Sequence, residues 1–185
     1  LTLKEARANP NVVGAAPFVS AQALLGRGDE VKGALVRGID PALEGQVTDM
    51  AADQMNVLKT LVPGEFSVVL GSELAHSMGV LPGDLVTLSA PSGQVTPAGV
   101  VPRIKQMKVA GTFNSGHYEY DSALVFMHHA DAEKIFRLEG PTGVRLKIQD
   151  LHTAPQVAQQ LEHSLSGHLL IRDWTQQNKT WFAAV

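Results

Sequence analysis

The stretch from Phe66 to Ser89 most constrains what this chain can fold into. An apolar run typical of a buried strand leads directly into a helical segment, Glu73 to Met78. Gly79 follows, and its backbone suits the left-handed end of a helix. A proline-glycine-aspartate turn then predicts a second strand, Leu85 to Ser89. Two strands and a helix in so short a stretch favour a fold that mixes α and β structure.

The rest of the chain alternates between extended and helical patterns. Strands are predicted over residues 12–23, 31–39, 66–70, 85–89, 105–112, 123–127, 144–148 and 169–171. Helices are predicted over residues 2–8, parts of 42–61, 73–78, 131–138, 157–165 and from Trp174 onward. Gly26 and Gly28 predict a hairpin turn between the first two strands. The ends are thus mixed and the middle is mostly strand and turn, which predicts a discontinuous α+β domain with a β-rich insertion.

Composition excludes several classes of function. With 44% hydrophobic residues, the 185 residues can build a real core. The 15 basic and 18 acidic residues leave a net charge of -3, and no basic block interleaves with aromatics, so nucleic acid is not an expected partner. The absence of cysteine rules out disulfides and thiolate metal sites.

The start of the chain predicts neither a membrane span nor a signal peptide. Its most apolar stretch, Val12 to Leu25, is interrupted by Pro17 and is too short for a bilayer core of about 30 Å. The first residue is leucine rather than methionine, so we expect an excerpt or a processed product.

Ser72 offers the clearest candidate for catalysis. It sits between a predicted strand and a predicted helix, as a hydrolase nucleophile does, but the second glycine of G-x-S-x-G is missing. Capping of the helix by Ser72 or Gly71 explains the pattern, and a small serine hydrolase is the alternative. We therefore expect no catalytic residue.

Histidines beside carboxylates raise the question of a metal site. The candidates are His117 with Glu119, His128 and His129 with Asp131, and His163 with His168. Two ligands leave a site incomplete, so no metal is expected. His128 and His129 are expected to end a strand before Asp131 caps the next helix. Gly26-x-Gly28 lacks the rest of a dinucleotide fingerprint, and no cofactor is expected.

Both tyrosines lie in one polar stretch, Asn114 to Ser122. A binding patch is one interpretation. The other, which we favour, is a tight turn in which the tyrosines pack inward and Asp121 accepts hydrogen bonds from backbone donors.

An apolar segment rich in proline, Pro91 to Pro102, separates two predicted strands. Its prolines exclude a central strand or a helix interior, so a loop at the tip of a hairpin is predicted. The segment could pack on its own domain, be disordered, or be offered to a partner. Valines such as Val95 are costly to expose and prolines restrict the unfolded chain, which argues against disorder.

Three stretches together resemble a known family. They are G-E-F-S-V-V-L-G-S-E-L-A-H-S-M-G-V-L-P-G-D-L-V-T-L, residues 64–88; T-P-A-G-V-V-P-R, residues 96–103; and V-A-G-T-F-N-S-G-H-Y-E-Y-D-S-A-L-V-F, residues 109–126. They are similar to the periplasmic domain of LolC/LolE-type subunits of lipoprotein-releasing transporters, within the wider MacB-like group. The similarity runs from about Val12 to Trp174.

The resemblance implies a porter-like α/β subdomain, residues 1–19 and 140–185, with an inserted β-rich sabre-like subdomain, residues 20–139. It implies a bacterial inner-membrane ABC transporter subunit with this domain in the periplasm. The expected partners are the chaperone LolA, lipoprotein substrates, a second transmembrane subunit and a cytoplasmic ATPase subunit. A MacB-like efflux or mechanotransmission domain that binds an adaptor protein is the alternative.

The resemblance also implies which residues would bind LolA. The proline-bounded segment, residues 91–102, would be a hook with contacts at Pro91, Val95, Thr96, Pro97, Val100, Val101 and Pro102. Arg103 and Lys105 would supply charge at its base. The chain departs from the family pattern at Thr87 and Ile104, where a basic and a polar residue would be expected.

Overall fold

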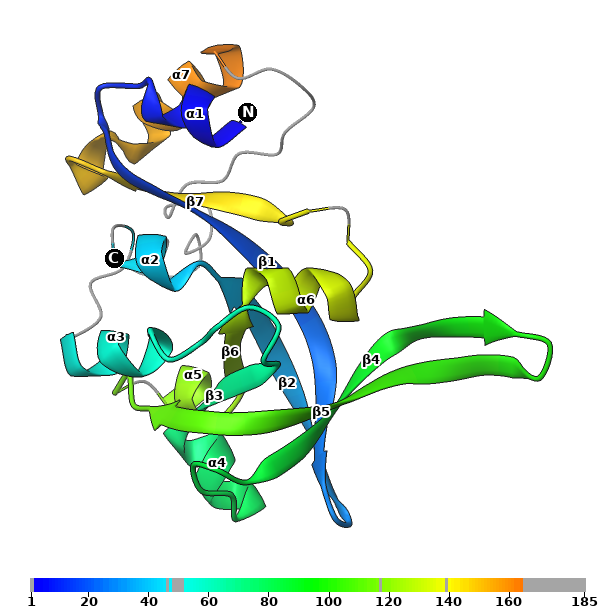
Figure 1. Cartoon of the computed structure of the whole chain (residues 1–185). Coiled ribbons are helices and arrows are strands. Elements are labelled where there is room, and N and C mark those ends of the chain that lie inside the picture. The colour runs from blue at the N-terminus through cyan, green and yellow to red at the C-terminus, as the bar shows by residue number, and fades with distance from the viewer. Residues whose placement is uncertain (1, 46, 48–51, 117, 139, 165–185) are drawn as a thin grey trace, which may run out of the picture.

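The structure is a computed structural model that describes residues 2–45, 47, 52–116, 118–138 and 140–164 (Figure 1). The predicted strand at residues 169–171 and the predicted helix from Trp174 lie outside the described residues, as do His117 and His168. None of the described helices is long and apolar enough to cross a membrane.

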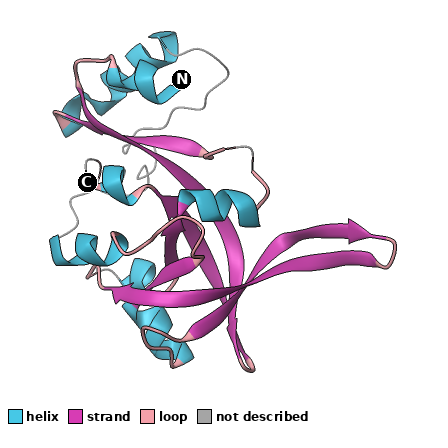
Figure 2. Ribbon diagram, viewed as in Figure 1, coloured by secondary structure: helices cyan, strands magenta, loops and turns pink. Residues whose placement is uncertain are grey.

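Strands form the body of the fold and short helices surround it (Figure 2). The strands are β1 (Val12–Arg27), β2 (Glu30–Ile39), β3 (Ser67–Gly71), β4 (Leu85–Thr96), β5 (Gly99–Phe113), β6 (Leu124–His128) and β7 (Gly143–Ile148). The α-helices are α1 (Thr2–Arg7), α2 (Pro41–Glu44), α3 (Ala52–Leu58), α4 (Ser72–Met78), α5 (Tyr118–Asp121), α6 (His129–Ile135) and α7 (Ala154–Ser164). One 3-10 turn, η1 (Leu151–Thr153), precedes α7.

Six of the strands close into a barrel. Their order is β2-β6-β3-β5-β4-β1, and β1 also pairs with β2, which joins the two ends of the sheet. The long first strand makes this closure possible because different parts of it pair with different neighbours. Its C-terminal part pairs with β2 from Phe18 onward and with β4 from Leu24 to Gly26.

The seventh strand lies outside the ring. β7 pairs with the N-terminal part of β1, between Val12 and Phe18, and α1 and α7 lie beside it (Figure 1). Phe18 is the residue at which β1 exchanges one partner for another, since it is paired with both Gly143 and Ile39. This exchange lies next to the predicted subdomain boundary at residues 19 and 20, and the division into two subdomains stays a prediction.

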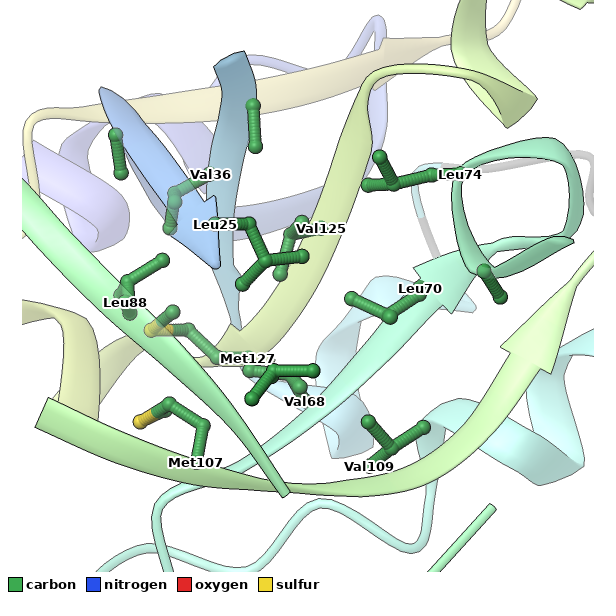
Figure 3. Packing of buried hydrophobic residues seen from close by; sticks show 14 of the residues in the cluster. Leu25, Val36, Val68, Leu70, Leu74, Leu88, Met107, Val109, Val125 and Met127 are labelled. Atoms are coloured by element: carbon green, nitrogen blue, oxygen red, sulfur yellow. The ribbon is translucent and has the colours of Figure 1, made fainter. Parts of the chain in front are cut away.

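Two hydrophobic clusters explain why β3 is buried along its whole length. Val68 and Leu70 point into the barrel with residues such as Leu25, Met107 and Met127 (Figure 3). Val69, one position out of phase, belongs to a second cluster with Leu58, Phe113 and Phe126. Alternating side chains of a strand face opposite sides, so a strand buried on both faces needs a continuous apolar run.

The mixed α+β class and most elements predicted from sequence are confirmed. The hairpin turn falls at Gly28-Asp29, between β1 and β2. Gly79 ends α4 with a φ of 66° and donates its backbone N–H to carbonyls of that helix. Gly71 is the N-cap of α4, and Ser72 is the first helical residue.

Two local predictions were wrong. His128, not Asp131, caps α6: its Nδ1 accepts from the backbone N–H of Ala130, because the helix starts two residues earlier than predicted. The tyrosines do not pack inward, since Tyr118 is 72% and Tyr120 is 52% exposed. The segment forms the short helix α5, in which Asp121 takes the buried position. Asp121 does accept from the Ser115 N–H and hydroxyl, as predicted.

Candidate functional site

A two-stranded arm projects from the barrel (Figures 1 and 2). β4 pairs with β1 only over residues 87–89, and β5 pairs with β3 only from Lys108 onward. Between these points the described strands β4 and β5 pair only with each other. We call residues 90–104 the arm.

The arm corrects the predicted loop. Instead of an irregular segment over residues 91–102, β4 continues to Thr96 and β5 begins at Gly99, so only Pro97 and Ala98 form the turn. Gly99 has a φ of 117°, a conformation that favours glycine. The prolines were expected to exclude a central strand, and they do not stand in one, because no third described strand pairs with the arm.

The strands tolerate Pro91 and Pro102 because the pairing is irregular where they lie. The register is Ala90 with Arg103 and then Gln94 with Val101, so three residues of β4 face one residue of β5. Proline has no N–H to donate, and it fits a strand only at such a bulge or at an edge. Prolines along an exposed ribbon also hinder the addition of another strand.

The turn of the arm is exposed at Pro97, Ala98 and Gly99. For the other expected contacts the structure gives the backbone only, and their side chains lie outside the described part of the chain. These residues are Pro91, Val95, Thr96, Val100, Val101 and Pro102. All seven expected contacts therefore lie on one ribbon, whose turn points away from the barrel (Figure 1).

The two expected base cations both contact the body of the protein. Nη1 of Arg103 donates to the carbonyl oxygen of Ile135, 3.3 Å away at the end of α6. The Nζ of Lys105 lies 4.3 Å from the centroid of the Phe66 ring, a cation–π contact. Contacts with α6 and with Phe66 therefore hold the base of the arm. Ile104, which lies between the two cations in sequence, is 63% exposed.

Sequence reasoning missed the residues that receive these cations. Phe66 was assigned only to a strand, and Ile135 only to a helix. Asp131, which accepts from the N–H groups of Gly64 and Phe66, was taken for a helix cap. The contact between Asp131 and the loop joins positions more than sixty residues apart, and no local pattern signals it.

The described residues show no arrangement of side chains that supports the catalytic or the metal-binding alternative. Among the described residues, Ser72 Oγ makes no hydrogen bond to a histidine, and no three metal-ligating side chains come together. A shallow hollow of about 640 Å³ is present. Its lining residues are Thr60, Glu65, Ser67, Gly83, Lys108, Val109 and Ala110. They include no histidine, and Glu65 is the single carboxylate among them.

Comparison with curated proteins identifies close relatives. The chain is 42% identical over 178 residues to the lipoprotein-releasing system transmembrane protein LolC of Neisseria meningitidis, covering 94% of this chain and 43% of that protein. It is 38% identical over 181 residues to LolC of Xylella fastidiosa 9a5c, covering 97% of this chain and 44% of that protein. A protein named LolE from Haemophilus influenzae is 25% identical over 172 residues. The chain thus spans less than half the length of these relatives. No family model matches it.

Solved structures share the fold. The extracellular domain of the noncanonic ABC-type transporter YknZ from Gram-positive bacteria superposes with a TM-score of 0.57 at 11% identity, covering 93% of this chain and 87% of that one. The periplasmic region of MacB from Actinobacillus actinomycetemcomitans gives a TM-score of 0.53 at 15% identity, covering 98% and 83%. At these identities the likeness concerns the fold alone.

Proposed function

Since the chain belongs to the family of LolC/LolE-type lipoprotein-releasing system transmembrane proteins, we propose that it is the periplasmic part of an ABC transporter subunit. In this proposal the subunit releases lipoproteins from the bacterial inner membrane. The arm docks the soluble chaperone LolA, which receives the lipoprotein. The domain itself makes and breaks no covalent bond.

The observation that carries the proposal is the geometry of the arm. A ribbon that pairs with no third described strand contributes nothing to closing the barrel. Its exposed turn, Pro97 and Ala98, stands away from the body (Figure 1). Such a protrusion is explained by a partner that covers it, because apolar residues left in water carry a free-energy cost.

The composition of the arm suits binding. The arm contains three valines, and burying several such side chains at about 25 cal/mol per Å² would yield a few kcal/mol. The three prolines restrict the free arm, so less conformational entropy is lost when the partner binds. We propose that apolar burial at Val95, Val100 and Val101 provides affinity, and that Arg103 and Lys105 orient the arm.

The remaining partners follow from the same family. Lipoproteins would be the cargo, a second transmembrane subunit would complete the membrane part, and a separate cytoplasmic subunit would hydrolyse ATP. Residues 1–19 and 140–185 would form a porter-like subdomain that carries the sabre-like barrel and its arm. The exchange of partners along β1 at Phe18 supports this division.

Removal of the arm tests the proposal. Because Ala90 and Arg103 are direct partners in the ladder, replacing residues 91–102 by Asn-Gly closes the hairpin with a two-residue turn. We expect the barrel to keep its unfolding midpoint while the capture of purified LolA in a pull-down is lost. Undiminished capture of LolA by the shortened protein would exclude the arm as the contact.

A point substitution sharpens the same test. Val101→Asp places a charge on the arm and should weaken LolA binding by tenfold or more, since a buried unpaired charge is costly. Val31→Asp is the matched control, because Val31 is an exposed valine on the other hairpin. Equal binding by the two variants would contradict the proposed contact.

The second candidate is a MacB-like efflux or mechanotransmission domain that binds an adaptor protein, which the shared fold with the MacB periplasmic region favours. The pull-down separates the two. Binding of an adaptor but not of LolA, by the unaltered protein, would favour this alternative.

A further inference from the structure

We infer that contacts at the base of the arm set its direction. They are made with the loop at residues 64–66 and with helix α6, which together we call the bracket. This inference rests on the proposed function only where it links the direction of the arm to LolA docking. The bracket holds two cations on the same face of β5, the partly buried Arg103 and the exposed Lys105, and so sets the direction in which the arm leaves the barrel. The residues that position the arm are Asp131 and Phe66 in the bracket and Arg103 in the arm itself.

Asp131 ties the two halves of the bracket together. This aspartate of α6 is 1% exposed. One carboxylate oxygen accepts from the Gly64 N–H at 2.8 Å and the other from the Phe66 N–H at 3.1 Å. A buried carboxylate that receives two backbone donors fixes both the helix and the loop, because leaving either unpaired would be costly.

Phe66 is held in a conformation that needs such support. Its φ is 52°, in the left-handed region that bulky residues rarely adopt. This conformation persists where surrounding contacts over-determine it. Here the hydrogen bond to Asp131 and packing of the ring against the barrel cluster provide those contacts. The ring then lies under Lys105, with Nζ 4.3 Å from its centroid.

Arg103 joins the arm to the other half of the bracket. Its Nη1 donates to the Ile135 carbonyl at 3.3 Å, at the C-terminal end of α6, where unpaired carbonyls attract cations. Its Nε is buried and has no partner among the described residues, so the side chain is enclosed rather than swinging in solvent. Ala90, directly opposite in the ladder, is 1% exposed, and the foot of the arm is therefore packed.

These contacts matter because no third described strand fixes the direction of the arm. Beyond Ser89 in β4 and before Lys108 in β5, the ribbon has no third strand beside it. An isolated two-stranded ribbon twists easily and is only marginally stable by itself. Residues 103 and 105 lie on one face of β5, two positions apart, so two anchor points resist both tilting and twisting.

The direction of the arm relative to the barrel can be measured without any partner. The chain has no cysteine, so Ala98→Cys at the exposed turn and Glu73→Cys on α4 introduce the only two thiols for spin labels. Pulsed electron paramagnetic resonance then gives the distribution of distances between the turn and the barrel. We expect a single narrow distribution in the otherwise unaltered protein.

Two substitutions loosen the bracket from opposite sides. Arg103→Met keeps the aliphatic stem but removes the donor, and Asp131→Asn removes one acceptor from the loop. We expect both to shift and broaden the distance distribution. Lys108→Met removes a cation from the barrel part of the same strand and should leave the distribution unchanged. If Asp131→Asn does not fold, Arg103→Met alone decides.

Each result has a definite consequence. A distribution in folded Arg103→Met that matches the unaltered protein would overturn the bracket. If the distance distribution of Arg103→Met broadens, its affinity for LolA should fall about fivefold. The more mobile arm then loses more conformational entropy when it binds. An unchanged affinity of Arg103→Met for LolA would overturn the link between the direction of the arm and docking. Failure of the unaltered protein to bind LolA would instead reject the proposed function and leave the distance result standing.

Discussion

Oε1 of Glu44 lies 3.9 Å from Nη1 of Arg145, which brings a buried carboxylate of α2 close to a guanidinium of β7. α2 follows the barrel strand β2, whereas β7 lies outside the ring. The pair therefore bridges the barrel and the layer beside it. Burial raises the pKa of Glu44, and the charges of Arg145 and then Arg37 oppose that rise. The raised pKa makes stability depend on the ionisation of Glu44.

The first prediction concerns Glu44 and pH. Because the pKa is raised above 4.5 in the folded state, the folded protein holds this proton more tightly than the unfolded chain. The stabilising contribution of Glu44 is thus present at low pH and is lost as the pH rises through the pKa of the folded state. Glu44→Gln imitates the protonated form. The free energy of unfolding of the unaltered protein, minus that of the variant, should fall as pH rises from 4 toward 7. A difference that grows over this range would mean that the arginines outweigh burial.

The second prediction concerns the close approach of β3 to α5. A Cβ added at Gly71 would lie 2.2 Å from the backbone carbonyl oxygen of Asp121, so the backbone would have to move. Gly71→Ala should therefore destabilise the protein by about 3 kcal/mol or more in urea unfolding. Gly33→Ala is the control, because nothing lies within 4 Å of that position. Similar losses in both variants would contradict the steric explanation.

The third prediction compares two helix ends. Gly79 ends α4 with a φ of 66°, whereas Gly45 ends α2 with a φ of −61°. An alanine is strained only at the first, so Gly79→Ala should cost about 1 kcal/mol and Gly45→Ala should cost little. Thermal unfolding followed by circular dichroism measures both. A larger loss at Gly45 than at Gly79 would show that backbone conformation is not the cause.

The fourth prediction concerns the cap of α6. Nδ1 of His128 accepts from the Ala130 N–H, and protonation would remove this acceptor. Burial, followed by the charge of His129, lowers the pKa of His128. Three acidic groups oppose the shift, and these are Asp131, Asp40 and Glu133. Stability from this group is present above pH 6.5 and is lost as pH falls through the folded pKa.

The measurement uses His128→Asn, which keeps a capping acceptor but does not titrate. The stability of the unaltered protein relative to this variant should decrease as pH is lowered below 6.5. A constant difference between the two proteins across that range would show that His128 titration is not coupled to folding.

Sequence patterns identified most elements but not the extent of the arm. The segment at Phe66 to Ser89 was predicted well because turn chemistry and apolar runs act locally. The arm was predicted as a loop because Pro91 and Pro102 disfavour regular pairing. The structure accommodates them in a bulge between Ala90 and Gln94, whose register depends on the opposite strand. Likewise, Tyr118 and Tyr120 are exposed because their segment forms α5, whose buried position is taken by Asp121.

The sequence by itself determined the α+β class, the hairpins, the glycine that ends α4 and the choice of residues 91–102 as the candidate site. These depend on backbone preferences and side-chain periodicity within a few residues of each other. Only the tertiary structure decided that β1 closes a barrel and then continues beside β7. It also placed Asp131 under the loop at residues 64–66 and Arg103 on the end of α6. Such contacts form between segments far apart in the chain, and which of them form is fixed only when the whole core packs.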